Sequence, residues 1–174
     1  MRVTLPRRRP RGGTSGSTGL KVREYMTSDV VTVGRTANVA QIASLLREHR
    51  ITGVPVVDDE RRLLGIVTHE ELINIFVPHY LSMFDDLAFL DDLSGIEAQT
   101  MAEIEPSLFL AEDVMVEGPV TVRPETSILK VAALLTNKKL VLIPVVDDGN
   151  RLVGVINRSD VSCALAGATP KEPE

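Results

Sequence analysis

The sequence has 174 residues, a length that fits one domain or two small units sharing a core. Hydrophobic residues make up 44% of it and aromatic residues only 3%, so the core must be built from aliphatic side chains. Its single cysteine excludes an intramolecular disulfide and a zinc site built from cysteines, and no apolar stretch approaches the roughly 20 residues of a membrane-spanning helix. The net charge is −5, and five of the 19 basic residues lie in residues 1–19. The rest of the chain therefore has 14 basic and 24 acidic residues, an acidic balance that argues against nonspecific binding to nucleic acid.

Residues 1–19 are rich in Arg, Pro, Gly, Ser and Thr and contain no acidic residue, a composition that cannot bury a core. The run Arg7-Arg8-Arg9 lacks the apolar stretch of a secretory signal. We expect a disordered basic tail or a misassigned start, with an organelle-targeting segment or a nucleic-acid arm as the alternative. The single cysteine favours a reducing compartment, so we expect a cytoplasmic protein, with organelle targeting by this tail as the alternative.

An internal repeat dominates the rest of the chain. Displaced by 89 residues, Met26–Leu72 aligns with Met115–Val161 without a gap, and 15 of the 47 positions are identical. Such a repeat indicates two copies of one unit of about fifty residues, each with little core of its own. The copies are therefore expected to bury their sheet faces against each other with pseudo-twofold symmetry.

Each copy begins with a short extended piece, at Val30–Val33 and at Val120–Val122, followed by a helix. Asn38 and Ser127 stand where the N-cap of that helix should be. The apolar residues then recur at i, i+3, i+4 and i+7, which is one helix face: Val39, Ile42, Ala43 and Leu46 in the first copy, and Ile128, Val131, Ala132 and Leu135 in the second.

A β-hairpin and a closing helix are predicted next in each copy. The strands are expected at 54–57 and 63–67, and at 143–146 and 152–156, where β-branched residues are dense. The turns between them contain Asp58-Asp59 and Asp147-Asp148, which we interpret as structural. Helices should start at His69 and Arg158. Each unit is thus β-α-β-β-α, and the fold class is α/β (α+β).

The two copies are joined by residues 77–108, which contain seven acidic residues and no Lys or Arg. Apolar residues recur there at helical spacing, so we expect an amphipathic helical insert that packs on the body or across a dimer: Tyr80, Met83, Phe84, Leu87 and Leu90. Its acidic pairs lack the spacing and the glycine of a calcium loop, which favours a solvated helix face. The expected organisation is a basic tail (1–19), a first motif (20–76), the insert (77–108), a second motif (109–165) and a flexible tail (166–174).

The sequence Pro-Val-Val-Asp-Asp, followed by Arg-Leu-x-Gly, occurs in both copies and resembles a tandem pair of cystathionine-β-synthase (CBS) domains. The resemblance covers about residues 20–76 and 109–165, and the long connection departs from many such pairs. It implies a non-catalytic regulatory module that binds an adenosine-type ligand, AMP, ADP, ATP or S-adenosylmethionine, in clefts between its motifs. It also implies a disc-like homodimer that acts on a regulated protein, which the sequence does not identify.

The resemblance further implies which residues form two clefts. In the primary cleft, Asp160 would bind the ribose hydroxyls, Asn157 would lie beside it at the helix start, and Arg158 would add positive charge for a phosphate. The adenine face would come from Val31, Ile51, Thr52, Gly53, Val54 and Pro55. The mirror cleft would use Thr68, Glu71, Val120, Leu140, Val141, Leu142 and Pro144. Glu71 replaces the family's Asp and Leu142 stands where the other copy has Gly53, so we expect the primary cleft to bind more tightly.

Helix capping is the alternative explanation for these polar residues, because Thr68-x-x-Glu71 is a capping box and Asn157 is a good N-cap. We favour ligand contact for Asp160 and capping for Glu71. The main alternative function is a structural or dimerisation scaffold with vestigial clefts, which recruits a partner protein through the acidic insert.

An enzyme is disfavoured, because the sequence has no nucleophile–base pair, no phosphate-binding loop motif and no metal cluster. His49, His69 and His79 lack metal-ligand spacing. Cys163 is expected to be a buried thiol near a helix end rather than a nucleophile.

Overall fold

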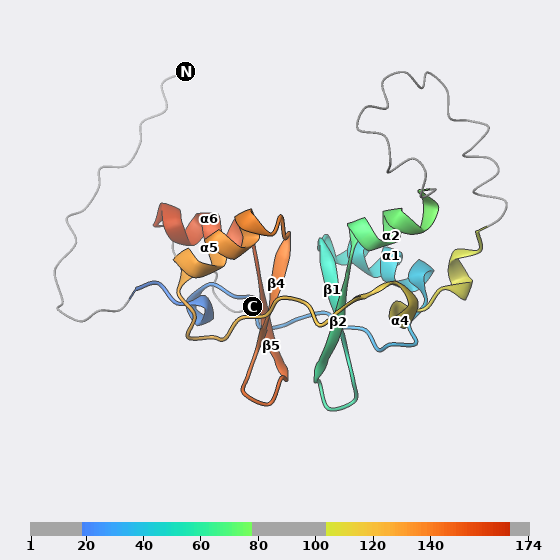
Figure 1. Cartoon of the computed structure of the whole chain (residues 1–174), viewed down its shortest axis with the longest axis horizontal. Helices are drawn as coiled ribbons and strands as arrows, with labels where there is room; N and C mark the ends of the chain where they lie inside the picture. The colour runs from blue at the N-terminus through green and yellow to red at the C-terminus, as the bar shows by residue number, and fades with distance from the viewer. Residues whose placement is uncertain (1–18, 78–103, 168–174) are drawn as a thin grey trace, which may run out of the picture.

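The computed structural model describes residues 19–77 and 104–167 of the chain (Figure 1). The first copy contains α1 (Val39–His49), β1 (Gly53–Val57), β2 (Leu63–Thr68) and α2 (His69–Phe76), and the second contains α5 (Ile128–Asn137), β4 (Leu142–Val146), β5 (Leu152–Asn157) and α6 (Arg158–Ala166). Four short elements stand before the first long helix of a copy: η1 (Val22–Glu24) before α1, and η3 (Pro106–Leu108), α4 (Ala111–Val114) and β3 (Val116–Glu117) before α5. The two hairpins lie at the centre, and the helices of each copy lie on the outer side of its hairpin.

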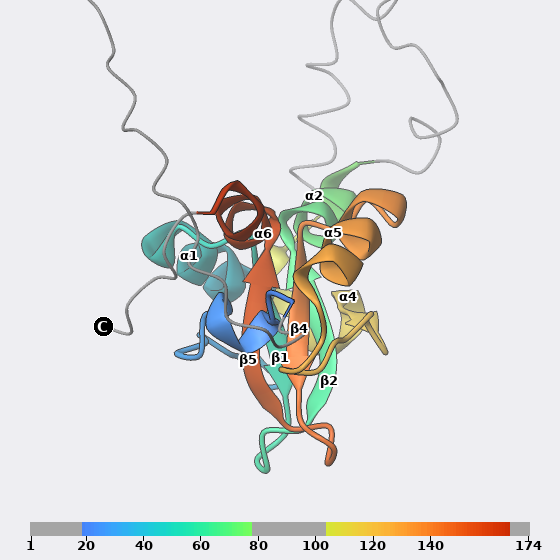
Figure 2. The ribbon, with the colours of Figure 1, turned by 90° about the vertical axis from the view of Figure 1, so that its left-hand side faces the viewer.

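The predicted fold class is confirmed: each copy folds as an antiparallel hairpin with two helices, and the copies are related by an approximate twofold axis. The short extended pieces do not form strands, and each makes only one isolated β-bridge. Val33 makes a single parallel bridge to Val56, and Val122 makes the equivalent bridge to Val145. Seen at right angles to Figure 1, the hairpin turns lie at one end of the molecule and the helices at the other (Figure 2).

The aspartates of the hairpin turns have the structural role that the sequence predicts. One carboxylate oxygen of Asp58 accepts hydrogen bonds from the N–H groups of Glu60 and Arg62, at 2.9 and 2.8 Å. Asp147 accepts equivalent hydrogen bonds from Gly149 and Arg151, both at 2.9 Å. Each aspartate therefore replaces, with its side chain, backbone hydrogen bonds that the turn lacks.

The predicted helix starts are confirmed as well. Asn38 caps α1 by accepting from the N–H of Gln41, and Ser127 caps α5 by accepting from the N–H of Lys130. The closing helices α2 and α6 begin at His69 and Arg158, after Thr68 and Asn157.

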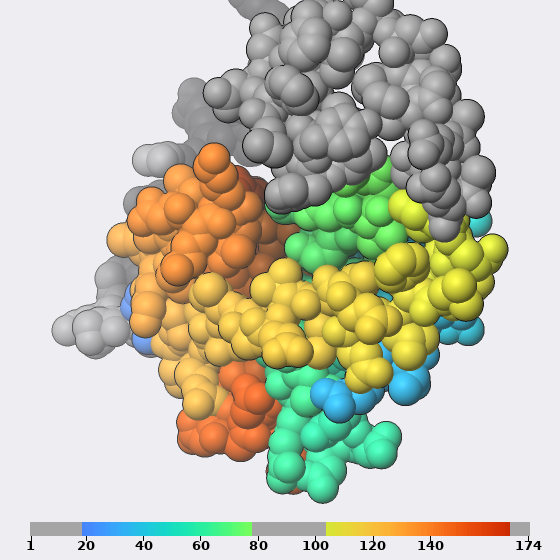
Figure 3. All heavy atoms as spheres, turned by 45° about the vertical axis from the view of Figure 1, so that its right-hand side comes forward, coloured from blue at the N-terminus to red at the C-terminus, as the bar shows by residue number. Residues whose placement is uncertain are grey.

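The segments that lead into the two copies are exchanged between them. Val22, fully buried, belongs to the core formed by the second copy, whereas Ala111, its repeat equivalent, belongs to the core of the first. The N–H of Val22 donates to the carbonyl of Thr126 at 3.0 Å, and that of Ala111 donates to the carbonyl of Ala37 at 2.7 Å. Figure 3 shows the leading segment of the second copy, in yellow, crossing the surface of both copies.

Two methionine–glycine contacts hold each leading segment against the hairpin of the other copy. A Cβ on Gly154 would lie 2.8 Å from the sulfur of Met26, and a Cβ on Gly65 would lie 2.6 Å from the sulfur of Met115. Only glycine leaves room for the methionine at these positions. The Met and Gly that are identical in the two copies are therefore a packing pair that joins one copy to the other.

A third, smaller core joins the hairpin ends, formed by Val57, Leu63, Val146 and Leu152. Backbone hydrogen bonds cross the axis beside it: Leu63 donates to the carbonyl of Asn150 at 3.0 Å, and Leu152 donates to that of Arg61 at 2.9 Å. Each copy thus completes its burial only in the presence of the other.

Some predictions concern residues that the structure does not describe. The apolar stripe and the acidic pairs of the insert lie in residues 78–103, outside the described residues, as do His79, residues 1–18 and residues 168–174. Across the described ranges, no helix has the length and apolar character needed to cross a bilayer.

The prediction that Cys163 is buried is wrong. Cys163 is exposed on α6, because that helix turns Val161 and Ala164 toward the core and Cys163 away from it.

Candidate functional site

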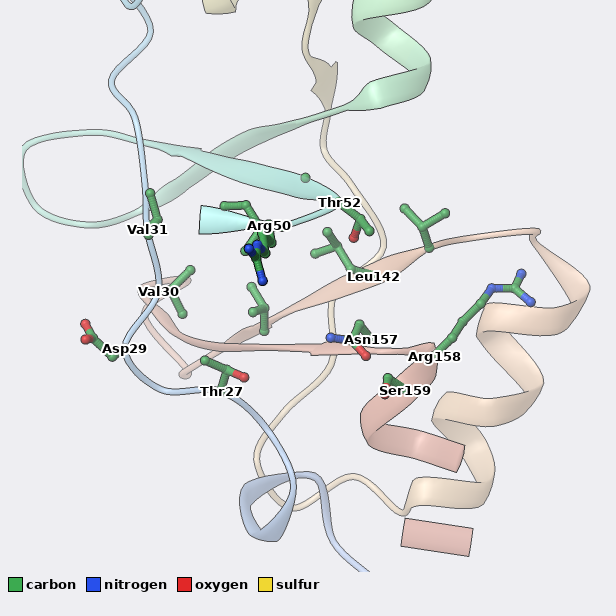
Figure 4. A pocket seen from close by; sticks show the side chains of 14 residues that line it. Thr27, Asp29, Val30, Val31, Arg50, Thr52, Leu142, Asn157, Arg158 and Ser159 are labelled. Carbon is green, nitrogen blue, oxygen red and sulfur yellow. The ribbon is translucent and has the colours of Figure 1, made fainter. Parts of the chain in front are cut away.

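A cavity of about 450 Å³ lies between the two copies (Figure 4). Its walls come from four places: the extended segment before α1, the junction of α1 with β1, the start of β4, and the end of β5 with the start of α6. The lining residues are Thr27, Asp29, Val30, Val31, Arg50, Ile51, Thr52 and Gly53 from the first copy, and Val141, Leu142, Val155, Asn157, Arg158 and Ser159 from the second. Its walls are mainly apolar, with a few polar groups, as is usual for small-molecule sites.

The end of α1 directs the first copy into this cavity. Arg50 follows the helix in the left-handed conformation, with φ of 53°, and its N–H donates to the carbonyls of Leu46 and Arg47. Ile51 then donates to Leu46 at 3.0 Å. The backbone thereby closes the helix and turns at once into β1, so that residues 50–53 lie along one wall.

Gly53 is required by packing. A Cβ at this position would lie 2.8 Å from Cδ2 of Leu142 and 2.9 Å from Cγ2 of Thr68. Leu142, the repeat equivalent of Gly53, is only 7% exposed and extends across the axis toward it. The approximate symmetry is therefore broken at the axis by one leucine side chain facing one glycine.

Six of the nine residues predicted for the primary cleft line this cavity: Val31, Ile51, Thr52, Gly53, Asn157 and Arg158. Val54 and Pro55 are buried within β1 and are not in its wall. Asp160 is not among the lining residues either.

Asp160 and Asn157 form a capping box at the start of α6. The carboxylate of Asp160 accepts from the N–H of Asn157 at 2.9 Å, and the side-chain oxygen of Asn157 accepts from the N–H of Asp160 at 3.0 Å. The amide nitrogen of the Asn157 side chain points toward the cavity in Figure 4. The first turn of α6 therefore presents Asn157 and Ser159 to the cavity, with Asp160 behind them.

Arg158 has a different environment from the one expected. Its guanidinium donates to the carbonyls of Leu140 and Leu135, at 2.8 and 2.9 Å, and so links the end of α5 and the loop after it to the start of α6. In Figure 4 the side chain extends away from the other lining residues. Its charge is thus used by the fold, and only the inner part of the residue lines the cavity.

Sequence reasoning missed four polar residues of the wall, namely Thr27, Asp29, Arg50 and Ser159. A signal for Arg50 was present in the repeat: its equivalent, Lys139, is also basic, and both follow the first helix of their copy. In the structure both residues have positive φ, 53° and 54°, just after the helix.

The residues of the mirror cleft do not gather around one cavity in the same way. Val141 and Leu142 line the cavity described above. Thr68 donates from its N–H and from its hydroxyl to one carboxylate oxygen of Glu71, at 2.7 and 2.6 Å, within the capping box of α2. Glu71 also lines a separate hollow of about 690 Å³, beside α2 and α4.

The other three residues of that set serve the fold. Pro144 is buried in β4, opposite Val155 of β5. The carbonyl of Leu140 accepts from Arg158. Val120 is half-buried in the extended piece before α5.

Comparison with known proteins identifies the family to which the two repeat copies belong. The CBS domain model matches residues 22–78 and 111–167. Among curated relatives, the chloroplastic CBS domain-containing protein CBSX1 of Arabidopsis thaliana is 30% identical over 160 residues, covering 80% of this chain. The chain spans 61% of the length of CBSX1.

Two solved structures share the fold. CBSX2 in complex with AMP is 25% identical and superposes with a TM-score of 0.65, over 86% of this chain and 98% of that one. The CBS domain pair of protein MJ0100, in complex with 5′-methylthioadenosine and S-adenosyl-L-methionine, is 21% identical, with a TM-score of 0.63 and coverage of 86% and 98%. The two matched stretches coincide with the two copies of the repeat, and the chain therefore belongs to the CBS domain family as a tandem pair.

Proposed function

We propose that this chain is a non-catalytic regulatory module that binds an adenosine-type ligand in the cavity between its two CBS motifs. The observation that carries the proposal is a cavity of about 450 Å³ with walls from both copies. A ligand there would contact the α1–β1 junction of one copy and the start of α6 of the other. It would bridge the copies, and any difference in its affinity for two arrangements of them would shift the balance between those arrangements.

The chemistry of the wall suits such a ligand. Val30, Val31, Ile51, Leu142 and Val155 offer an apolar slot for a flat base. The side chains of Asn157 and Ser159 and the free N–H groups of the first turn of α6 suit ribose oxygens and a phosphate. The lining residues include no His or Cys, the usual groups of acid–base or thiol catalysis.

AMP is the first ligand to test, because CBSX2 has been solved with AMP. ADP, ATP and S-adenosylmethionine stay within the same proposal. We propose a weaker or empty mirror cleft, since Leu142 occupies the axis and Glu71 is held by its cap.

A homodimer and an unidentified regulated protein complete the proposal. Exposed apolar side chains on the helices support an assembly: Ile73 on α2 is 58% exposed, Leu129 on α5 72%, and Leu165 on α6 53%. Sedimentation of the full chain, with and without AMP, tests this part directly, and a monomer under both conditions would remove it.

The test of ligand binding is a thermal-shift series of the full chain with AMP, ADP, ATP and S-adenosylmethionine. A ligand at one hundred times its Kd should add about 2.7 kcal/mol, which is roughly 5–10 °C in Tm. Thr52→Trp, which fills the exposed mouth of the cavity, should abolish the shift. Thr36→Trp, the same change before the other end of α1, should not. No shift with any of the four ligands contradicts the proposal.

One observation favours the scaffold alternative. The carboxylate of Asp160 and the guanidinium of Arg158, two groups expected to bind ligand, both make hydrogen bonds within the fold. A scaffold with vestigial clefts predicts no ligand response in the same series. Its recruiting segment would be the acidic insert, most of which lies outside the described residues.

For location we propose the cytoplasm, with targeting by residues 1–19 as the alternative that chloroplastic CBSX1 makes relevant. Fluorescent fusions with and without residues 1–19 distinguish the two. Identical diffuse distributions support the cytoplasm, and a distribution in an organelle that is lost with the tail supports targeting.

A further inference from the structure

Arg50 occupies a backbone conformation that does not suit an arginine. Its φ of 53° is in the left-handed region, which costs a residue with a Cβ free energy that glycine does not lose. Glycine, or sometimes asparagine, is the usual residue at this position after a helix. A strained residue in the wall of a cavity is a reason to look for a functional role of its side chain.

The side chain of Arg50 is directed into the cavity between the two copies (Figure 4). Among the described residues its guanidinium makes no hydrogen bond and no ion pair, whereas the guanidinium of Arg158 is bound to two carbonyls. The acidic residue of the wall, Asp29, is exposed at its edge, with the carboxylate turned away from Arg50 in Figure 4. Arg50 is therefore the cation that this cavity offers to a ligand.

A second source of positive potential faces the same space. The helix α6 has nine residues, and its first turn, with Asn157 and Ser159, lies in the opposite wall. The first N–H groups of a helix have no partner within the helix and carry the positive end of its dipole. A negative group in the cavity would lie between this helix end and the guanidinium of Arg50.

We propose that Arg50 is the residue with which this cavity recognises the anionic group of its ligand, a phosphate or a carboxylate, and that it distinguishes charged from neutral adenosine compounds. The inference rests on the proposed function, since it assigns a role within the same cavity.

The repeat provides a matched control in Lys139. Lys139 is the repeat equivalent of Arg50, with a φ of 54°, an exposed side chain and a positive charge, but it does not line the cavity. Replacing either residue by glycine relieves the same backbone strain. Only the replacement of Arg50 removes a cation from the cavity.

The test is calorimetric titration of the full chain with AMP and with adenosine. The wild-type chain should bind AMP at least tenfold more tightly than adenosine, and this preference should shrink as salt is raised. Arg50→Gln should weaken AMP about tenfold or more and change adenosine by less than twofold. S-adenosylmethionine, titrated in parallel, tells whether a carboxylate can replace the phosphate, since its affinity then falls in the same variant.

The glycine variants add a readout that a structural role would not give. Arg50→Gly should raise the Tm of the unliganded chain by roughly 1–3 °C while AMP binding falls. Lys139→Gly should raise the Tm to a similar extent and leave the AMP affinity unchanged. A residue that merely stabilised the fold would lower the Tm when removed.

The outcomes separate the two proposals. If the wild-type chain binds neither adenosine nor any of AMP, ADP, ATP and S-adenosylmethionine, the proposed function fails. If it binds both equally, or if Arg50→Gln weakens both equally, the role of Arg50 is overturned while the cavity remains a ligand site. The assignment is also overturned if Arg158→Gln loses the preference for AMP and Arg50→Gln keeps it.

Discussion

The two copies of the repeat have the same elements but end their first helix in different ways. In the first copy, the backbone N–H groups of Arg50 and Ile51 close α1. In the second, the backbone N–H groups of Lys138 and Lys139 close the last turn of α5, and the side chain of Arg158 extends back from α6 to two further carbonyls. The difference leaves one arginine free to face the cavity and commits the other to the fold. A duplicated unit can thus keep its architecture while its two clefts acquire different chemistry.

The axis between the copies shows the same asymmetry in packing. Gly53 and Leu142 are equivalent in the repeat, yet one leaves space and the other fills it. Because a single leucine lies across the axis, the two clefts cannot have the same shape. Variants that remove or exchange these differences test how much each one matters.

Truncation of Leu142 should have the largest effect. Leu142→Ala removes a side chain that is 7% exposed at the contact between the copies, and should lower the free energy of unfolding by about 2–4 kcal/mol. Leu108→Ala, at a position 76% exposed, should change it by less than about 0.5 kcal/mol. Chemical denaturation measures both, and equal small losses would mean that the axis is not a packed contact.

Adding a methyl group opposite that leucine should be the next largest effect. Gly53→Ala would place a Cβ 2.8 Å from Cδ2 of Leu142, and should cost about 1–3 kcal/mol. In the Leu142→Ala background the cost should fall by at least about 0.5 kcal/mol, because the clashing atom is gone. Strict additivity of the two substitutions in denaturation experiments would contradict direct contact across the axis.

The arginine that donates to the end of α5 should contribute less. Arg158→Gln loses two hydrogen bonds from a charged, exposed group and should cost about 1–2 kcal/mol. His69→Gln at the equivalent position should cost less than about 0.5 kcal/mol, because the backbone closes α1 without it. Similar losses from both variants would remove the distinction between the two helix ends.

Removing the capping acids should have the smallest effect on stability. Asp160→Ala and Glu71→Ala each lose a hydrogen bond to a backbone N–H and should each cost about 0.5–1 kcal/mol. Under the proposed function only Asp160→Ala also weakens AMP binding, through the ribose contact that the CBS resemblance implies. If calorimetry finds AMP affinity unchanged in both variants, Asp160 is a capping residue alone.

Much of the fold was predictable because it depends on local patterns. The caps at Asn38 and Ser127, the turn aspartates and the hairpins are all set by neighbouring residues. The exchange of leading segments was not predictable, because Val22 and Ala111 stand in short stretches without periodicity, and their burial depends on the other copy. The orientation of Cys163 depends in the same way on which face of α6 packs.

The site could be predicted only in part, for a related reason. Repeat and family resemblance indicated residues 51–53 and the start of α6, which do line the cavity. The direction of a long side chain, however, depends on which carbonyls are left without partners nearby. Arg158 donates to one carbonyl in α5 and to one just after it, whereas the guanidinium of Arg50 makes no hydrogen bond among the described residues.

The most direct test of the central claim is the stoichiometry of AMP binding to the full chain, measured by isothermal titration calorimetry. Two distinct clefts predict one tight site per chain, abolished by Thr52→Trp and retained in Thr36→Trp. Two equal sites per chain, or an affinity unchanged by Thr52→Trp, would contradict a single cavity made jointly by the two copies.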